Sequence, residues 1–174
     1  MSYAILDTGN SRSFPAEHAL LGGAVKDLKS AKVVIVLGEH AGTHAKSLKK
    51  WKDNVAVLIE LGTESLGVHT GESRAEEGSN VLGFARFRLG DAEPTNLVEL
   101  VRQPRTDKAA LDAAKALFEG AGLEVAVCGD SSGRIIDRLV RPYYNAALRR
   151  LDEGLASADD LDTTLKLGLG YPEG

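Results

Sequence analysis

Two histidines four residues apart, His40 and His44, are the first candidates for chemistry in this sequence. On a helix, this spacing can place two imidazoles on one side, where they could bind the same metal ion. Neither a cysteine nor a third ligand accompanies them, so we interpret them as surface histidines. His18 and His69 lie in segments without an evident partner. The sequence therefore predicts no metal centre.

A single glycine, Gly9, lies in the turn that follows the first predicted strand. A dinucleotide-binding turn usually carries three glycines, because its backbone must approach a pyrophosphate closely at the start of a helix. Residues 1–30 are also too short for the two strand–helix units that normally precede a strand like the one predicted from Lys32. The sequence therefore favours an ordinary turn over a phosphate-binding loop.

The composition limits the classes of protein to which the chain can belong. Its 174 residues are 43% apolar and 26% charged, which is typical of a folded domain with a real core. A net charge of -4 gives no reason to expect a nucleic-acid partner. No apolar run is long enough for a membrane helix, and we see no signal peptide. The single Cys128 suits a reducing compartment, so we expect a cytoplasmic protein without a membrane partner.

Strands and helices alternate along the first 128 residues. The β-branched runs at Lys32–Leu37 and Val55–Leu61 are typical of buried parallel strands. Further strands are predicted at Tyr3–Asp7, Asn80–Leu89, Leu97–Gln103 and Leu123–Cys128. Helices are predicted from Pro15 to about Leu28, at Thr43–Asp53 and at Asp107–Glu119. This alternation favours a three-layer α/β fold with a mostly parallel sheet.

One long helix is predicted from about Arg134 to Leu151, with Ser131 or Ser132 capping its first turn. Its apolar residues form two adjacent rows on one side of the helix. The rows are Ile135, Leu139, Tyr143 and Ala147, and Ile136, Val140, Tyr144, Leu148 and Leu151. Ser157, with Asp160 three residues later, predicts the start of a final short helix.

The same stretch carries a family resemblance. Asp130-Ser-Ser-Gly133, Pro142-Tyr-Tyr-Asn145 and the Gly-Leu-Gly-Tyr-Pro string at residues 168–172 resemble the start of the C-terminal domain in 3-hydroxyacyl-CoA dehydrogenases. A looser resemblance runs back to about Ala31. The resemblance implies a shortened Rossmann-like α/β domain at residues 1–130 and a helical segment at residues 131–174. It also implies NAD as the family cofactor and acyl-CoA as a ligand.

The family's catalytic positions can be carried over one at a time. Ala85 stands where the resemblance places the catalytic histidine, and alanine cannot exchange a proton. The glutamate that orients this histidine falls on Glu99, and the serine falls on Ser65. The asparagine falls on Asp137, whose ionised carboxylate cannot donate a hydrogen bond. The family's nearby phenylalanine falls on Arg134.

Two of the four catalytic roles are therefore missing. We expect a protein of fatty-acid or aromatic-acid breakdown that is not catalytic alone, needs no cofactor alone and has an accessory or assembly role. The alternative is an active NAD-dependent 3-hydroxyacyl-CoA dehydrogenase. The wide apolar face of helices 134–167 predicts a homodimer. Four lysines favour a solvated helix face, with contact to coenzyme A phosphates as the alternative: Lys46, Lys49, Lys50 and Lys52.

Overall fold

The computed structural model describes residues 1–44, 53–71, 80–88 and 90–171. The chain divides into two compact units, Met1–Arg134 and Ile135–Gly174. The first unit contains all six strands and the second contains two helices. The assignment of residues 1–130 and 131–174 to two functional domains stays a prediction.

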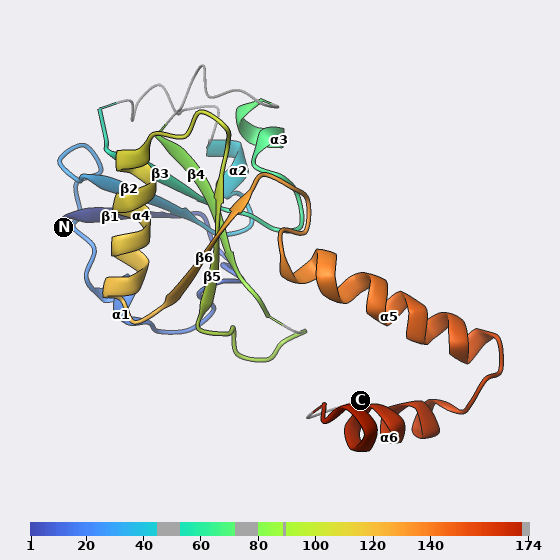
Figure 1. Cartoon of the computed structure of the whole chain (residues 1–174). Helices are drawn as coiled ribbons and strands as arrows, with labels where there is room; N and C mark the ends of the chain where they lie inside the picture. The colour runs from blue at the N-terminus through green and yellow to red at the C-terminus, as the bar shows by residue number, and fades with distance from the viewer. Residues whose placement is uncertain (45–52, 72–79, 89, 172–174) are drawn as a thin grey trace. The chain divides into compact units, whose positions relative to one another are not determined.

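A six-stranded sheet forms the middle of the first unit (Figure 1). The strands lie side by side in chain order: β1 (Tyr3–Asp7), β2 (Val33–Leu37), β3 (Ala56–Glu60), β4 (Val81–Arg86), β5 (Leu97–Arg102) and β6 (Glu124–Gly129). β1 to β4 are parallel, β5 is antiparallel to β4, and β6 is parallel to β5. The predicted α/β fold with a mostly parallel sheet is confirmed.

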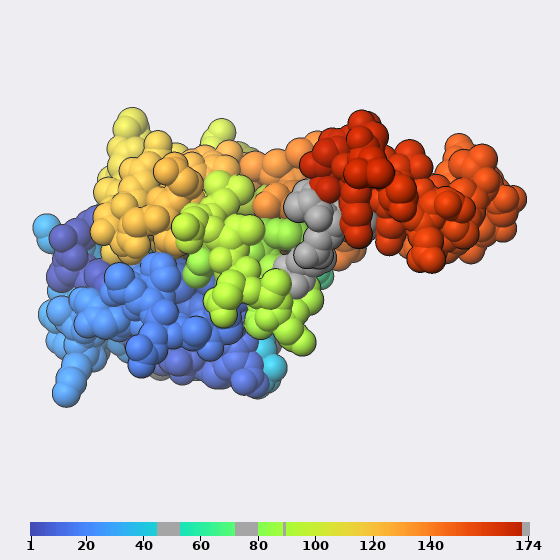
Figure 2. Space-filling view, turned by 90° about the horizontal axis from the view of Figure 1, so that it is seen from below, coloured from blue at the N-terminus to red at the C-terminus, as the bar shows by residue number. Residues whose placement is uncertain are grey.

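Helices cover both faces of this sheet, which explains why every residue of β2 and β3 is buried. On one face, α4 (Lys108–Gly120) packs over the strands, and Phe118 lies 5.1 Å from Phe84, measured between ring centroids. Figure 2 shows α4 in yellow beside the N-terminal residues in blue. On the other face, α2 (Ala41–His44) and the segment of α3 (Gly67–Thr70) contribute Ala41 and Leu66 to a second core.

The helix predicted from Pro15 to about Leu28 is wrong in length. Helix α1 comprises only Ala19–Gly22, and His18 caps it through a hydrogen bond from the Leu20 amide to Nδ1. Gly23 ends the helix where a side chain would overlap the Tyr3 hydroxyl. That hydroxyl donates to the Leu20 carbonyl at 2.7 Å. A tertiary contact therefore ends a helix that the local sequence would continue.

The second unit contains α5 (Ile136–Asp152) and α6 (Ala158–Leu169), in agreement with the two predicted helices. The predicted cap at Ser131 or Ser132 is wrong, because α5 begins after Ile135 without a side-chain cap. Ser157 does cap α6, since its hydroxyl accepts from the Asp160 amide. Neither helix contains a buried residue. Within the described parts of the chain, no helix is long and apolar enough to cross a membrane.

Candidate functional site

A pocket lies at the carboxyl ends of β1, β2 and β3. These ends meet at one edge of the sheet because the three strands are parallel, and this edge is where open α/β sheets usually bind ligands. The pocket has a volume of about 270 Å³. It is lined by Asn10, Arg12, Gly38, Glu39, Gly42, Thr43, Glu60, Leu61, Gly62, Glu64 and His69.

The carboxylate of Glu60 connects the loops that surround this pocket. Its side chain is buried at the end of β3, with the residue 6% exposed. One oxygen accepts from the Ser13 amide and the other from the Gly38 amide, each at 2.7 Å. The loop after β1 and the loop after β2 are therefore both attached to β3 through one side chain.

The two loops also bind each other through their backbones. The Glu39 amide donates to the Gly9 carbonyl at 3.0 Å, and the Thr8 amide donates to the Leu37 carbonyl at 2.9 Å. Gly38 has φ +100°, and a Cβ there would overlap the Gly9 carbonyl oxygen. These amides serve contacts between the loops and are not available to a bound phosphate.

This arrangement does not fit the pyrophosphate of a dinucleotide. Such a group needs free backbone amides and the N-terminus of a helix behind the first turn. Here the first helix after β1 starts only at Ala19, and it has four residues. In addition, three carboxylates line the pocket, those of Glu39, Glu60 and Glu64. Their charge has the same sign as that of the pyrophosphate, so it opposes binding.

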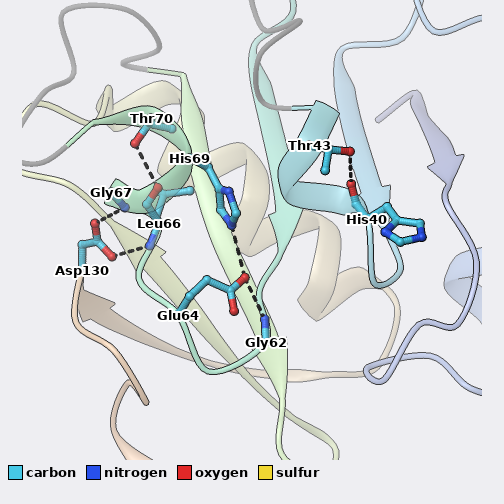
Figure 3. A network of polar contacts seen from close by, with 9 residues as sticks. All are labelled: His40, Thr43, Gly62, Glu64, Leu66, Gly67, His69, Thr70 and Asp130. Atoms are coloured by element: carbon cyan, nitrogen blue, oxygen red, sulfur yellow. Dashed lines mark hydrogen bonds and ion pairs between the residues drawn. The ribbon is translucent and has the colours of Figure 1, made fainter.

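One wall of the pocket carries a histidine–glutamate pair. His69 belongs to α3, and Glu64 lies in the loop before it (Figure 3). His69 Nε2 lies 3.2 Å from Glu64 Oε1, which also accepts from the Gly62 amide at 3.1 Å. The hydrogen bond from His69 is the main cause that lowers the pKa of Glu64 to about 2. The imidazole lies directly over Gly42, where a Cβ would overlap the ring. Gly42 is therefore the residue that lets α2 and α3 approach each other.

Asp130 holds the segment that carries this pair (Figure 3). Its two carboxylate oxygens accept from the Leu66 and Gly67 amides, each at 2.7 Å, at the start of α3. Gln103 Nε2 donates to Asp130 Oδ2 at 3.1 Å, and the Thr70 hydroxyl donates to Gln103 Oε1 at 3.1 Å. Since Asp130 follows β6 directly, the predicted position Ser65 lies in a loop fixed by a residue far along the chain.

The structure brings two of the predicted catalytic positions together. Ala85 and Glu99 face each other across the antiparallel pair β4–β5, so their side chains lie on the same face of the sheet. Both are buried, with 4% and 2% exposed. Glu99 therefore lies beside Ala85, the position at which the resemblance predicts a histidine.

Arg134 binds Glu99 instead. Arg134 Nε donates to Glu99 Oε2 at 3.1 Å, and the two side chains are 8% and 3% exposed. Arg134 has φ +47°, a left-handed conformation that an arginine rarely adopts. Its Nη1 is buried without a hydrogen-bond partner. Sequence reasoning missed this partner, although a glutamate inside an apolar strand signals that a cation must be near.

The other two predicted positions are not part of this contact. Ser65 is partly buried in the loop after β3, and its carbonyl accepts from the Val68 amide at 3.3 Å. Asp137 lies in the second unit, on α5, where it pairs with Arg141 at 3.9 Å.

The four histidines have separate surroundings. His18 caps α1, His40 Nε2 lies 3.6 Å from Glu39 Oε1, and His69 pairs with Glu64. His44 is the last residue of α2. Among the described residues, no three His, Cys, Asp or Glu side chains form a group that could hold a metal ion.

Two further features from the sequence are the single cysteine and the lysine-rich segment. Cys128 is half-buried, and this burial raises the pKa of its thiol. The predicted lysine face at residues 46–52 lies outside the described residues.

Known proteins resemble parts of this chain. The family model for the "3-hydroxyacyl-CoA dehydrogenase, C-terminal domain" matches residues 133–174. The human mitochondrial hydroxyacyl-coenzyme A dehydrogenase is 37% identical over 92 residues, which cover 52% of this chain and 29% of the human protein. A probable 3-hydroxyacyl-CoA dehydrogenase of Caenorhabditis elegans is 38% identical over 121 residues, which cover 67% of this chain and 37% of that protein.

Solved structures extend the similarity to the fold. The (S)-3-hydroxybutyryl-CoA dehydrogenase PaaH1 of Ralstonia eutropha matches with a TM-score of 0.70 and 26% identity. The match covers 88% of this chain and 56% of that structure. The chain thus spans only part of the length of each protein that it matches.

Removing Arg134 alone should destabilise the first unit strongly. We expect Arg134→Met to lower the free energy of unfolding by about 3–5 kcal/mol, because Glu99 would remain buried without its cation. Combining it with Glu99→Leu should recover most of this loss. The measurement is urea unfolding of both variants, with Arg138→Met as the control, since exposed Arg138 lies on the surface of α5. A double variant no more stable than Arg134→Met would contradict the importance of this pair.

Acid should weaken the Glu64–His69 contact in a defined pH window. The pKa of Glu64 is lowered to about 2 from its ordinary value of 4.5, so its contribution to stability is complete above pH 4.5. The contribution is lost as the pH falls from 4.5 through about 2. Since the side chain is 35% exposed, we expect about 1 kcal/mol rather than the full linkage value.

The test is a carbon-detected NMR titration of the Glu64 carboxyl, with urea unfolding of Glu64→Gln at several pH values. Glu17→Gln serves as the control, because Glu17 is exposed outside the pocket. A titration midpoint near 4.5 in the folded protein would show that the contact with His69 has no effect on Glu64.

Proposed function

Because the chain belongs to the 3-hydroxyacyl-CoA dehydrogenase family, which is NAD-dependent, we propose that it is a member without dehydrogenase activity of its own. Its role is accessory: it assembles with other chains in fatty-acid or aromatic-acid breakdown. The observation that carries this proposal is the Ala85–Glu99–Arg134 arrangement. The glutamate of the family's catalytic pair is present, but its partner is an arginine.

This arrangement leaves no group at position 85 that could accept a proton from the hydroxyl group of a substrate. Oxidation of a hydroxyl group requires a base that accepts the hydroxyl proton within hydrogen-bond reach. Alanine has no such atom, and a guanidinium stays protonated at any pH at which a protein is folded. Arg134 also neutralises the charge of Glu99, so the carboxylate is not free to act as the base itself.

The loops at the carboxyl ends of β1 and β2 support the same proposal for the cofactor. The Thr8 and Glu39 amides donate to the Leu37 and Gly9 carbonyls, and the Ser13 and Gly38 amides donate to Glu60. In a dinucleotide-binding domain, the corresponding amides contact the pyrophosphate. We infer that this chain does not bind NAD by itself.

An assembly role is supported by the second unit. Nine large apolar side chains at residues 135–171 are exposed, although soluble monomers rarely expose continuous apolar patches of this kind. They are Ile135, Leu139, Tyr144, Leu148, Leu151, Leu155, Leu167, Leu169 and Tyr171. Such a face fits a second copy of the chain, because a two-fold axis buries the same face on both copies.

The charges of the two helices favour the same occupant. The polar side of α5 is basic, with Arg138, Arg141, Arg149 and Arg150, whereas the first turns of α6 carry Asp159, Asp160 and Asp162. In a two-fold pair, α5 of one copy can lie beside α6 of the other, so that opposite charges meet at the rim. We therefore propose a homodimer that forms through residues 134–167.

The purified chain should not oxidise 3-hydroxyacyl-CoA. With the base absent, we expect a loss of at least about 10²–10⁴-fold from this effect alone, and more if NAD is not bound. The assay follows NADH absorbance, with an active family member as the positive control. A turnover number of about 10 s⁻¹, which is ordinary for an enzyme, would support the alternative of an active dehydrogenase. Activity that appears only on adding a partner chain would support an accessory role.

NAD should leave the melting temperature of the chain unchanged. A ligand that binds only the folded state at 100 times its Kd stabilises it by about 2.7 kcal/mol, which a thermal scan detects easily. The scan is run with NAD and, as a control for ionic strength, with the same concentration of phosphate. A saturable rise with NAD that phosphate does not reproduce would contradict the proposal.

Charged residues on the apolar face should separate the dimer. We expect the paired replacement Tyr144→Lys and Leu148→Glu to shift the mass measured by light scattering from dimer to monomer, because the charges would be buried at the interface. Asn145→Glu is the control, since Asn145 lies on the exposed polar side of α5. A monomeric mass for the unmodified chain at micromolar concentration would rule out the homodimer.

A further inference from the structure

We propose that the outer edge of β6 is an interaction surface for a second copy of this chain, with the two β6 strands antiparallel about a two-fold axis at Ala126. This contact lies in the first unit and is separate from the dimer proposed through residues 134–167. It rests on the backbone groups of β6 that have no partner and on the way in which the strand matches itself.

β6 is the last strand of the sheet, so only one of its edges is paired. The Glu124 amide donates to the Asn96 carbonyl at 2.9 Å, and successive residues of a strand direct their N–H and C=O groups to alternate sides. Glu124, Ala126 and Cys128 therefore bond to β5, whereas Val125 and Val127 direct their backbone groups outward. Within the described residues, no segment pairs with these outward groups.

The opposite edge of the sheet is covered by the chain itself. Ala4 of β1 forms a parallel bridge with Val25, whose amide donates to the Tyr3 carbonyl at 2.8 Å. β6 carries neither a lysine nor a proline, and its register with β5 runs without a bulge over Glu124–Gly129. Natural proteins commonly use these devices to keep an edge strand from pairing. Val127 is also 40% exposed, so the unpaired edge has apolar surface.

The sequence of β6 matches itself when two copies run antiparallel. An axis at Ala126 places Val125 of one copy opposite Val127 of the other, so each of these pairs can exchange both of its N–H···O bonds. Both members are β-branched, which is favourable in a cross-strand pair. Glu124 then lies opposite Cys128 of the other copy rather than opposite the second Glu124. Because no like charges meet, a second copy of the strand is a suitable partner.

A pair of short strands is a small interface. It buries less than the about 1,200–2,000 Å² of a stable complex, so we expect it to be populated only well above the micromolar concentrations used to measure the helical dimer. A chain that uses both contacts forms assemblies larger than a dimer, because each two-fold contact leaves the other surface free.

Disulfide trapping at high protein concentration tests the contact. Opposite residues that do not exchange hydrogen bonds have Cα atoms about 4.5 Å apart, which a disulfide can span. Ala126→Cys, combined with Cys128→Ser, should therefore link to its own copy under mild oxidation and give twice the 18.5 kDa mass of one chain. Glu124→Cys with Cys128→Ser is the matched control, because its two cysteines would lie about 13 Å apart. No link at position 126, or equal linking in both variants, would overturn the proposal.

The native cysteine tests the register of the pair. Glu124→Cys with Cys128 retained should form the linked dimer that Glu124→Cys with Cys128→Ser does not, because the axis brings these two positions together. Val127→Pro removes only an outward N–H, which an edge strand tolerates, so the circular dichroism spectrum should be unchanged. Added to the Ala126→Cys variant, it should slow linking at least about fivefold, the effect of roughly one lost hydrogen bond. Unchanged linking in a folded Val127→Pro variant would contradict backbone pairing at this edge.

A last comparison separates this contact from the helical dimer. The trap at position 126 is repeated in the chain that carries Tyr144→Lys and Leu148→Glu. Linking should persist there, because β6 does not belong to the second unit. Loss of linking in this variant would assign the trapped dimer to the helices and overturn the β6 contact, whereas linking without a helical dimer would overturn only the helical one.

Discussion

A buried carboxylate must have partners, and this constraint shapes both polar centres of the first unit. Glu60 is the last residue of β3 and Glu99 lies in β5, and both are almost completely buried. Glu99 has a full counter-charge in Arg134, at the cost of a left-handed backbone at that arginine. Glu60 has two backbone amides from two different loops. Glu99 and Arg134 thus form a buried ion pair, whereas Glu60 lines the pocket at the carboxyl ends of the parallel strands.

The ion pair with Arg134 explains how a glutamate can be buried at position 99 although no histidine stands opposite it at position 85. A buried glutamate that lost its histidine would be costly to keep, since its desolvated charge would have no partner. An arginine from the start of the helical segment supplies one. Paired in this way, Glu99 can stabilise the fold, which fits the structural role proposed above.

In the second unit, apolar side chains are exposed rather than polar ones buried. Its two helices bury no residue of their own, and Tyr143 of α5 stacks on Tyr171, which follows α6, with 5.7 Å between the ring centroids. Helices that short gain most of their stability from tertiary packing rather than from intrinsic propensity. The cap at Ser157 and the left-handed Gly170 define α6 locally, but they do not cover its apolar side chains. The homodimer proposed above would cover these side chains.

The sequence by itself determined the elements whose signals are local. The buried runs predicted β2 and β3, and the two apolar rows predicted α5. Only the tertiary structure decided which groups meet. Arg134 reaches Glu99 across 35 residues, and Ser13 reaches Glu60 across 47. The short α1 likewise depends on the hydroxyl of Tyr3, which is distant in the chain. Periodicity reports the face of one element, whereas such partners depend on how several elements pack, so no local pattern contains them.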